Sequence, residues 1–127
     1  LAELARVLAP GGRLLLDLMN PARVKATLVP ESRTRRGALE IHERRHLEGG
    51  GTRVVRVVKD VHVQSDDGGE RRWREDVRLY EPDELDLLLA QAGFGRLRRE
   101  GDFDGQAFRA DSPRQIVWAQ RGALASD

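Results

Sequence analysis

The stretch RVLAPGGRLLLDLMNP, residues 6–21, decides how the rest of the chain can be arranged. Pro10 cannot continue a helix, and the following Gly11 and Gly12 supply the permissive backbone that a sharp reversal needs. An apolar run interrupted by one aspartate comes next, and a run of this kind is typical of a strand buried on both faces, as in a parallel sheet. We therefore expect a helix that ends at Pro10, a turn, and a buried strand over Arg13–Met19.

Composition limits the classes of protein that this chain can belong to. The 127 residues suggest one domain, 34% of them are charged, and the net charge of +1 gives no overall attraction to nucleic acid or anionic lipid. The absence of cysteine rules out disulfides and thiolate metal sites. No apolar run approaches membrane-spanning length, so we expect a cytoplasmic protein. The chain opens at Leu1 already inside a helical pattern and without a capping residue, like a piece of a longer protein.

The middle of the chain, residues 21–80, has the two-residue periodicity of half-buried strands. Three segments alternate in this way, namely Leu39–Leu47, Arg53–Val63 and Glu70–Tyr80. Glycine-rich turns separate them at residues 48–51 and 66–69, which predicts a three-stranded antiparallel meander. Before the meander, residues 22–28 favour a short helix, and Ser32–Arg36 is interpreted as a solvated basic run.

The last third of the chain returns to a helix-and-strand pattern. Pro82 favours the start of a helix, and Gly93 is a natural stop for it. Strands are then expected over Gly95–Glu100 and Gln115–Gln120. The connection between them, Gly101–Arg114, is longer than a tight turn, and loops of this length in compact domains are usually functional or mobile.

Four segments in this order resemble the C-terminal half of class I S-adenosylmethionine-dependent methyltransferases. They are LAELARVLAPGGRLLLDLMN (1–20), VRLYEPDELDLLLAQAGF (77–94), GDFDG (101–105) and DSPRQIVWAQR (111–121). The resemblance implies an α/β fold, the C-terminal portion of a Rossmann-like methyltransferase sheet with a three-stranded antiparallel β insert. Residues 1–20 and 81–127 would belong to the sheet, and residues 21–80 would form a connector and a substrate lid.

The resemblance also says where the cofactor would be held. Members of that family hold S-adenosyl-L-methionine mainly with a glycine-rich loop after the first strand and an acidic residue ending the second, and neither region is in this chain. The resemblance thus implies a methyltransferase whose cofactor is bound mainly by residues upstream of Leu1, with no cofactor-binding residue here and an inactive isolated fragment. The acceptor would be a small molecule, and whether its reacting atom is O, N or C stays open.

Topology predicts where a substrate would lie. If the strand after the Pro82 helix runs parallel to Arg13–Met19, the Gly101–Arg114 loop leaves the sheet at the end where Asn20 lies, and open α/β sheets bind ligands at that end. Substrate contacts are therefore expected from Asn20, Arg78, Tyr80, Asp102, Asp104, Phe108 and Arg114.

Each of these residues has a second interpretation as part of the scaffold. The two loop aspartates have the alternative of making turn hydrogen bonds, as aspartate often does. Tyr80 has the alternative of packing, Arg78 of pairing with a carboxylate, and Phe108 of anchoring the loop. The sequence contains no conspicuous catalytic motif, and methyl transfer needs mainly positioning of the reacting atoms.

Two other kinds of site are disfavoured. His42 and His46 lie four residues apart on an expected strand, about 13 Å, which is too far to share one metal ion without help. The arginines of the 71–78 region alternate with Glu70, Glu75 and Asp76, so nucleic-acid binding is not expected.

A different class of function stays open beside the methyltransferase. The missing glycine loop favours a non-enzymatic α/β module that binds a protein or dimerises, and the long GDFDG-containing loop disfavours it. The strand 13–19 would lack a neighbour on one side, so pairing with another chain through this exposed edge is expected in either case.

Overall fold

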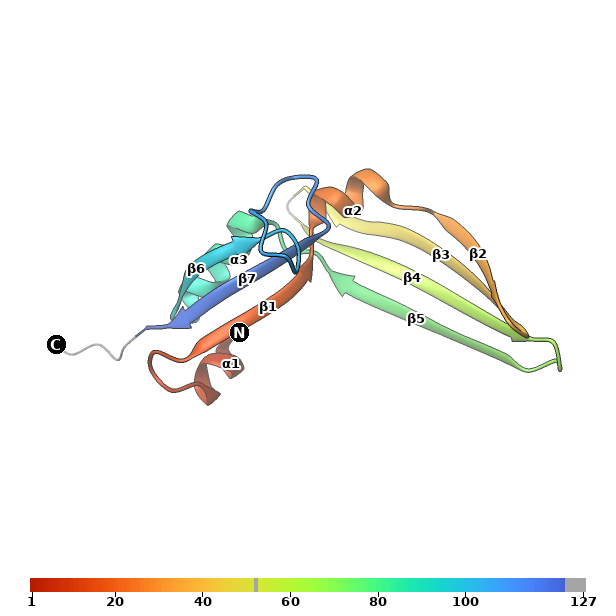
Figure 1. The fold of residues 1–127 in the computed structure, drawn as a ribbon, viewed down its shortest axis with the longest axis horizontal. Coiled ribbons are helices and arrows are strands. Elements are labelled where there is room, and N and C mark those ends of the chain that lie inside the picture. Colours follow the sequence, from red (N-terminus) through yellow and green to blue (C-terminus); the bar gives the residue numbers. More distant parts are fainter. Residues whose placement is uncertain (52, 123–127) are drawn as a thin grey trace. The chain divides into compact units, whose positions relative to one another are not determined.

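The chain folds into two compact units, which the computed structural model describes over residues 1–51 and 53–122 (Figure 1). The first unit combines residues 1–23 with the chain from Tyr80 onward. The second unit comprises Val24–Leu79.

A three-stranded sheet and two helices build the first unit. Its elements are α1 (Ala2–Val7), β1 (Arg13–Met19), α3 (Pro82–Gln91), β6 (Phe94–Glu100) and β7 (Arg114–Arg121). The strand order is β1-β7-β6, and β7 is antiparallel to both of its neighbours, so β1 and β6 run parallel to each other. These elements confirm the helices and strands predicted for both ends of the chain.

Helix α3 forms where its local signals place it. Pro82 occupies the first turn, where its missing N–H is not needed, and the acidic side chains of Asp83 and Glu84 lie at the positive end of the helix dipole. Gly93 follows the helix with φ of 90°, a conformation that favours glycine. These signals confirm the predicted start and stop of the helix.

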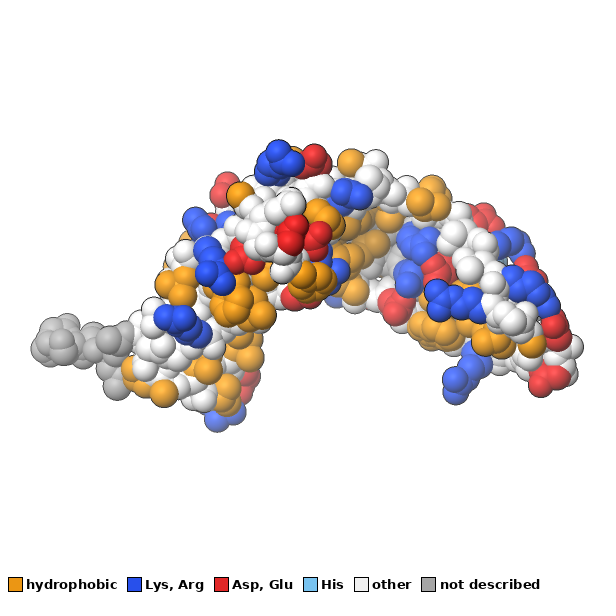
Figure 2. Space-filling model, viewed as in Figure 1, with side chains coloured by type: hydrophobic (Ala, Val, Ile, Leu, Met, Phe, Trp, Pro, Cys, Tyr) orange, Lys and Arg blue, Asp and Glu red, His pale blue; other side chains and the backbone are white. Residues whose placement is uncertain are grey.

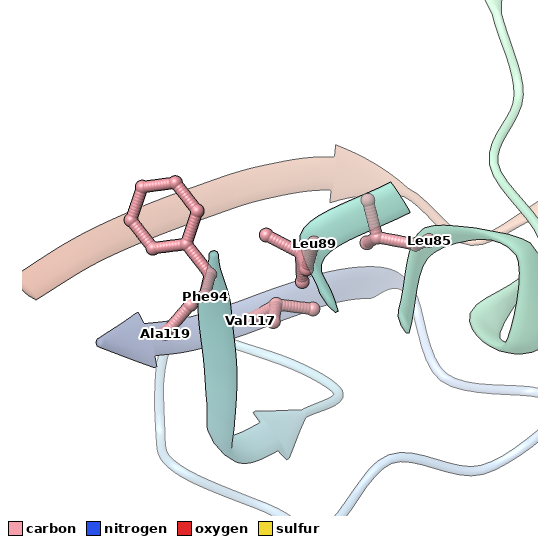
Figure 3. Packing of buried hydrophobic residues seen from close by; sticks show 5 residues of the cluster. All are labelled: Leu85, Leu89, Phe94, Val117 and Ala119. Atoms are coloured by element: carbon pink, nitrogen blue, oxygen red, sulfur yellow. The ribbon is translucent and has the colours of Figure 1, made fainter. Parts of the chain in front are cut away.

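The core of the first unit lies between the sheet and the helices (Figure 3). Leu85 and Leu89 of α3 pack with Phe94 of β6 and with Val117 and Ala119 of β7, and all five are buried. Partly buried side chains surround this cluster, namely Ala5, Leu8, Leu14, Leu16, Leu18, Tyr80 and Ala92. Both α1 and α3 thus cover the same face of the sheet.

The burial of β1 differs from the prediction. We expected a strand covered on both faces, but its residues alternate between exposed and half-buried. Leu14, Leu16 and Leu18 face the core, whereas the side chain of Leu15 is 49% exposed on the opposite face. The reason is that the described helices of this unit pack against one face, so a continuous apolar run here does not mean two-sided burial.

A four-stranded antiparallel sheet makes up most of the second unit. Its strands are β2 (Glu31–Arg36), β3 (Leu39–Gly50), β4 (Arg53–Ser65) and β5 (Glu70–Arg78), in the order β2-β3-β4-β5, and α2 (Pro21–Thr27) precedes them. The helix and the meander of β3, β4 and β5 confirm the predictions for this region.

Strand β2 is the element that the sequence interpretation missed. It lies in the run interpreted as solvated and pairs with β3 from Glu31↔Arg44 to Arg36↔Leu39. Five of its six residues are exposed and all six are polar or charged, so no alternation of apolar and polar residues marks it. The feature of the sequence that could have indicated this strand is Gly37, whose φ of 58° supports the tight turn between β2 and β3.

The two glycine clusters lie in hairpin turns, as predicted. A Cβ atom at Gly49 would lie 1.9 Å from the carbonyl oxygen of Val54, so only glycine fits at this bulge of β3. The β4–β5 turn is closed by Gly69, whose N–H donates to the carboxylate of Asp67 over 2.9 Å.

Among the described residues, no helix is long and apolar enough to span a membrane; α3 has 10 residues.

Candidate functional site

The end of β1 and the Gly101–Arg114 loop meet at one end of the sheet. Because β1 and β6 are parallel, Asn20, which follows β1, and the loop, which follows β6, leave the sheet at the same end. The side-chain amide of Asn20 donates to three loop carbonyl oxygens, at 3.2 Å for Arg109, 3.1 Å for Ala110 and 2.8 Å for Ser112. The structure thus confirms that Asn20 and this loop lie at the same end of the sheet.

Asn20 is 1% exposed, so its amide nitrogen donates to the loop and not to solvent. Its Oδ1 atom is buried and has no hydrogen-bond partner among the described residues. A direct contact with a substrate stays a prediction for this side chain, whereas its contact with the loop is a feature of the structure.

The loop has an internal framework of its own. The N–H of Gly101 donates to the carbonyl oxygen of Gln106 over 2.7 Å, and the N–H of Arg114 donates to the carbonyl oxygen of Gly101 over 2.9 Å. The buried Ser112 accepts the N–H of Arg109 on its Oγ over 2.8 Å. Gly101 lies so close to Ser112 that a Cβ atom there would be 2.3 Å from the Ser112 Oγ. The loop is therefore closed upon itself at its base.

The two loop aspartates make the turn hydrogen bonds that were left open as an alternative. Oδ1 of Asp102 accepts the N–H of Phe103 over 2.8 Å, and Oδ1 of Asp104 accepts the N–H of Gln106 over 3.1 Å. In the described part of the chain, Oδ2 of each side chain has no hydrogen bond. Each carboxylate can therefore support its turn and still bind a ligand with its second oxygen.

Arg114 connects the loop to β1. Its guanidinium donates to both carboxylate oxygens of Asp17, over 2.7 and 3.1 Å, and lies 4.8 Å from the ring centre of Phe103. The hydrogen bond to Asp17 raises the pKa of Arg114 above its ordinary value. The ring of Phe103 is 72% exposed at the loop tip. The guanidinium of Arg114 thus interacts with both a carboxylate and an aromatic ring.

A buried polar network lies beneath the loop, and the sequence interpretation missed it. Gln115, which is fully buried, donates from Nε2 to the carbonyl oxygen of Tyr80 over 2.8 Å and accepts from Nε of Arg99 over 3.0 Å. Arg99 also donates to Asp86 over 2.7 Å. The ring of Phe108 lies 5.9 Å from the guanidinium of Arg99. The only signal in the sequence is a glutamine placed beside an apolar strand segment.

The other predicted contact residues have defined places. Tyr80 packs against the hydrophobic core of the first unit. Arg78 is the last residue of β5 in the second unit. Substrate binding by either residue stays a prediction.

Over residues 1–51 and 53–122, no glycine-rich turn joins a strand to a following helix. The cradle that a methyltransferase uses for its cofactor needs such a turn, where backbone N–H groups approach the ligand. The glycines of residues 49–51 and 68–69 instead connect antiparallel strands. S-adenosylmethionine is therefore not assigned to any residue described here.

The chain is similar to several solved structures. It matches CcbJ methyltransferase from Streptomyces caelestis at 23% identity and a TM-score of 0.76, over 96% of this chain and 51% of that one. A S-adenosylmethionine-dependent methyltransferase from Clostridium acetobutylicum gives 10% identity, a TM-score of 0.76 and coverage of 96% and 49%. CalS10, an amino pentose methyltransferase from Micromonospora echinaspora, gives 22% identity, a TM-score of 0.55 and coverage of 94% and 48%.

These likenesses define the fold and its extent. Neither a protein-family model nor a curated protein matches the chain. The chain spans about half the length of the solved structures to which it is similar. It has the fold of the C-terminal part of these methyltransferases, as the sequence predicts.

Proposed function

We propose that this chain is the C-terminal part of an S-adenosylmethionine-dependent methyltransferase that transfers a methyl group to a small-molecule acceptor. The observation that carries the proposal is the topology shared with two solved methyltransferases over 96% of the chain, at a TM-score of 0.76. Because the chain spans about half of each of them, the cofactor is assigned in this proposal to residues upstream of Leu1. The isolated chain is then inactive.

The acceptor would approach the end of the sheet where Asn20 and the Gly101–Arg114 loop meet. Support for this comes from the general rule that open α/β sheets bind ligands beyond the carboxyl ends of their parallel strands. Asn20 would act by holding the base of the loop, and the second carboxylate oxygens of Asp102 and Asp104 would bind the acceptor. In this proposal the antiparallel sheet of the second unit is the substrate lid, and Arg78 is one of the substrate contacts.

One of the similar proteins guides the choice of acceptors to test. CalS10 is an amino pentose methyltransferase. Amino sugars are accordingly the first acceptors to try, with hydroxylated sugars lacking the amine as the matched comparison. A carboxylate such as Asp104 suits an amine, because it can accept a hydrogen bond from it.

The test is transfer of labelled methyl groups by the protein encoded from the reading frame extended upstream of Leu1. We expect transfer by the extended protein and none by the 127-residue chain. Asp104→Asn keeps an oxygen for the Gln106 N–H and removes the charge, so it should raise KM about tenfold. Asp111→Asn, at an exposed position of the same loop, should leave KM unchanged. An extended protein without any transfer would argue against the proposal.

A second function, assembly through the sheet edge, is favoured by the position of β1. This strand is at the edge of the three-stranded sheet, and the side chains of Leu15 and Met19 are 49% and 36% exposed. An exposed edge strand with apolar side chains readily pairs with another strand. Sedimentation of the isolated chain should reveal a dimer that Leu15→Lys weakens, and a monomer at all concentrations would speak against this function.

A further inference from the structure

The four-stranded sheet of the second unit has a polar groove on one face. The groove has a volume of about 630 Å³, a size typical of small-molecule sites. Six ionisable residues that line it come from all four strands, namely Arg33, His42, Arg44, Asp60, His62 and Arg72. Figure 2 shows basic side chains lying among acidic ones over this sheet.

The register of the strands explains why these side chains gather. Arg33 lies directly opposite His42, His42 opposite His62, and His62 opposite Arg72, so one row of four residues crosses the sheet. Directly paired side chains on neighbouring strands have Cβ atoms about 4.5–5.5 Å apart. The row therefore places two imidazoles side by side between two guanidinium groups.

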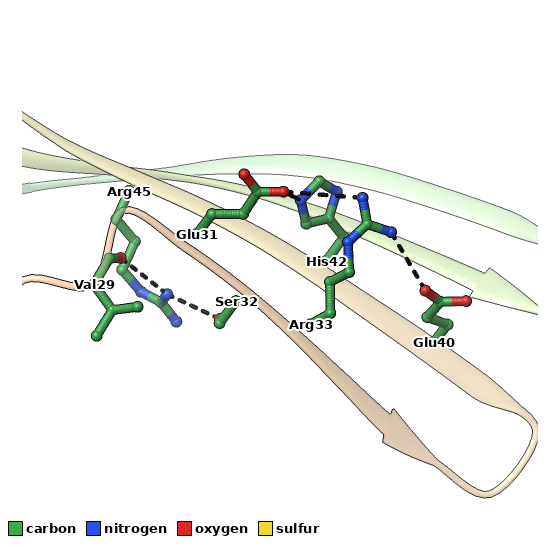
Figure 4. Close-up of polar contacts among 7 residues, drawn as sticks. All are labelled: Val29, Glu31, Ser32, Arg33, Glu40, His42 and Arg45. Atoms are coloured by element: carbon green, nitrogen blue, oxygen red, sulfur yellow. Dashed lines mark hydrogen bonds and ion pairs between the residues drawn. The ribbon is translucent and has the colours of Figure 1, made fainter.

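Each imidazole is already bound to a carboxylate at the edge of the groove. Nε2 of His42 lies 2.6 Å from Oε1 of Glu31 (Figure 4), and Nε2 of His62 lies 2.6 Å from Oε1 of Glu70. Hydrogen bonds to His42 and to Arg72, respectively, lower the pKa values of Glu31 and Glu70, so both are ionised at neutral pH. An ionised carboxylate can only accept, so Nε2 of each ring is the donor.

This arrangement fixes what the other ring nitrogen can do. In a neutral imidazole whose Nε2 carries the proton, Nδ1 is an acceptor and repels an anion; in the protonated ring, Nδ1 becomes a donor. Among the described residues, neither His42 nor His62 has a hydrogen-bond partner at Nδ1. Both nitrogens thus change from anion-repelling to anion-binding when the rings gain a proton.

Arg44 supplies a permanent positive charge beside the two rings. Its cross-strand neighbours are Glu31 and Asp60, but Glu31 binds His42, and Asp60 accepts two hydrogen bonds from Arg74 at 2.7 and 3.2 Å. Within the residues that the structure describes, Arg44 itself makes no ion pair. Its guanidinium is therefore available to a ligand in the groove.

We propose that the groove binds a tetrahedral oxyanion, sulfate or phosphate, free or as the ester of a small molecule, through Arg44 and protonated His42 and His62. A tetrahedral anion accepts hydrogen bonds in several directions, which suits donors arriving from two strands, and a guanidinium pairs with two of its oxygens. The proposal does not depend on methyl transfer.

Binding should strengthen as the pH falls, because protonation of the two rings adds positive charge to surrounding charges that cancel one another. The four arginines facing the rings are Arg33, Arg44, Arg72 and Arg74, and the four carboxylates are Glu31, Glu40, Asp60 and Glu70. Protonation of the two histidines adds two positive charges to this balanced set. Since an anion favours the protonated rings, linkage requires tighter binding at lower pH.

Sulfate is used as the probe because it stays a dianion between pH 5 and 8. A change in affinity across this range then reflects the charge of the protein and not that of the ligand. The 127-residue chain is titrated with sodium sulfate at constant ionic strength, at about pH 5.5 and about pH 8, with the ring resonances of His42 and His62 followed by NMR. We expect affinity at least about tenfold higher at the lower pH. Equal affinity at both pH values, or no binding, would overturn the proposal.

Variants identify the donors. Arg44→Gln should weaken sulfate binding about tenfold at the lower pH, and His42→Gln with His62→Gln should abolish the pH dependence. Arg71→Gln is the matched control, because Arg71 is an exposed arginine of β5 that pairs with Val63 and points to the other face. If Arg44→Gln and Arg71→Gln weaken binding equally, the effect comes from the net charge of the protein and not from Arg44 in the groove, and the proposal is overturned. Circular dichroism checks that each variant is folded.

The source of the anion is tested at the lower pH with inorganic phosphate and methyl phosphate. Binding of the ester supports an open groove that admits a substituted phosphate, and binding of inorganic phosphate alone supports a site for a free ion. If neither inorganic phosphate nor methyl phosphate binds at concentrations where sulfate is expected to saturate the site, the proposed oxyanion site is contradicted.

Discussion

The side-chain amide of Asn20 donates a 2.8 Å hydrogen bond to the carbonyl oxygen of Ser112, which is 92 residues further along the chain. The same amide also contacts the carbonyl oxygens of Arg109 and Ala110. One buried side chain at the end of β1 thus holds the base of the loop that follows β6.

Removing this amide should destabilise the first unit. Asn20→Ala removes the amide from the carbonyl oxygens of Arg109, Ala110 and Ser112, of which that of Arg109 still accepts the Ser112 N–H, and we expect a loss of about 2–3 kcal/mol in the free energy of unfolding. Asn20→Asp, which brings a carboxylate against the same carbonyl oxygens, should cost at least as much. Urea denaturation measures both changes. Arg109→Ala is the control, because the Arg109 side chain is exposed and only its backbone carbonyl contacts Asn20; a cost equal to that of Asn20→Ala would contradict this account.

Gly101 should be intolerant of any side chain. A Cβ atom there would meet the Ser112 Oγ at 2.3 Å and the Ser112 Cβ at 2.7 Å, so Gly101→Ala forces the base of the loop apart. We expect a cost of about 1–3 kcal/mol, seen as a lower Tm. Gly95→Ala on the preceding strand is the matched control, since nothing lies within 4 Å of a Cβ atom there. If the two variants melt at the same temperature, the close approach of Gly101 and Ser112 is wrong.

The buried network around Gln115 should matter more than the exposed ion pairs of the same sheet. Gln115→Leu removes the side-chain donor to the Tyr80 carbonyl oxygen and the side-chain acceptor of the Arg99 Nε, and we expect a loss of about 2–4 kcal/mol. Arg96→Ala breaks an exposed contact of 3.4 Å with Asp86 and should cost less than about 1 kcal/mol. Denaturant midpoints compare the two, and a reversed order of the costs would refute the network.

Acid should destabilise the sheet of the second unit. The pKa values of Glu31, Asp60 and Glu70 are lowered by hydrogen bonds to His42, Arg74 and Arg72, respectively. A carboxyl group with a lowered pKa in the folded state stabilises it above the unfolded pKa, and this contribution is lost as the pH falls through the folded value. The ordinary values are 4.5 for glutamate and 3.8 for aspartate, so stability should fall below these pH values.

Urea midpoints measured across this range test the prediction. Asp60→Asn removes one of the three titrating groups, so its midpoint should depend less steeply on pH than that of the unaltered chain. A midpoint that stays constant as the pH falls below 4.5, or a variant with the same slope, would show that these ion pairs do not stabilise the sheet.

The sequence was sufficient for the elements that carry strong local signals. Pro82 and Gly93 mark both ends of α3, and the glycines at residues 68–69 mark the β4–β5 hairpin. The convergence of Asn20 with the 101–114 loop also followed from the sequence, because a helix between β1 and β6 made parallel strands the natural arrangement.

The remaining features depend on pairing between distant residues, which local patterns do not encode. Strand β2 consists of polar and charged residues, most of them exposed, and is held by its pairing with β3, so its own sequence has no strand periodicity. The one-sided burial of β1 depends on which face the helices cover. The groove in the second unit requires the register that places His42 opposite His62, and this register became known only from the structure.

The central claim, that this chain completes a methyltransferase whose cofactor site lies elsewhere, is tested most directly by calorimetric titration with S-adenosylhomocysteine. The 127-residue chain and the protein extended through the upstream reading frame are compared under the same conditions. The account predicts no measurable binding by the chain alone and binding in the micromolar range by the extended protein. Micromolar binding by the chain alone, or none by the extended protein, would contradict it.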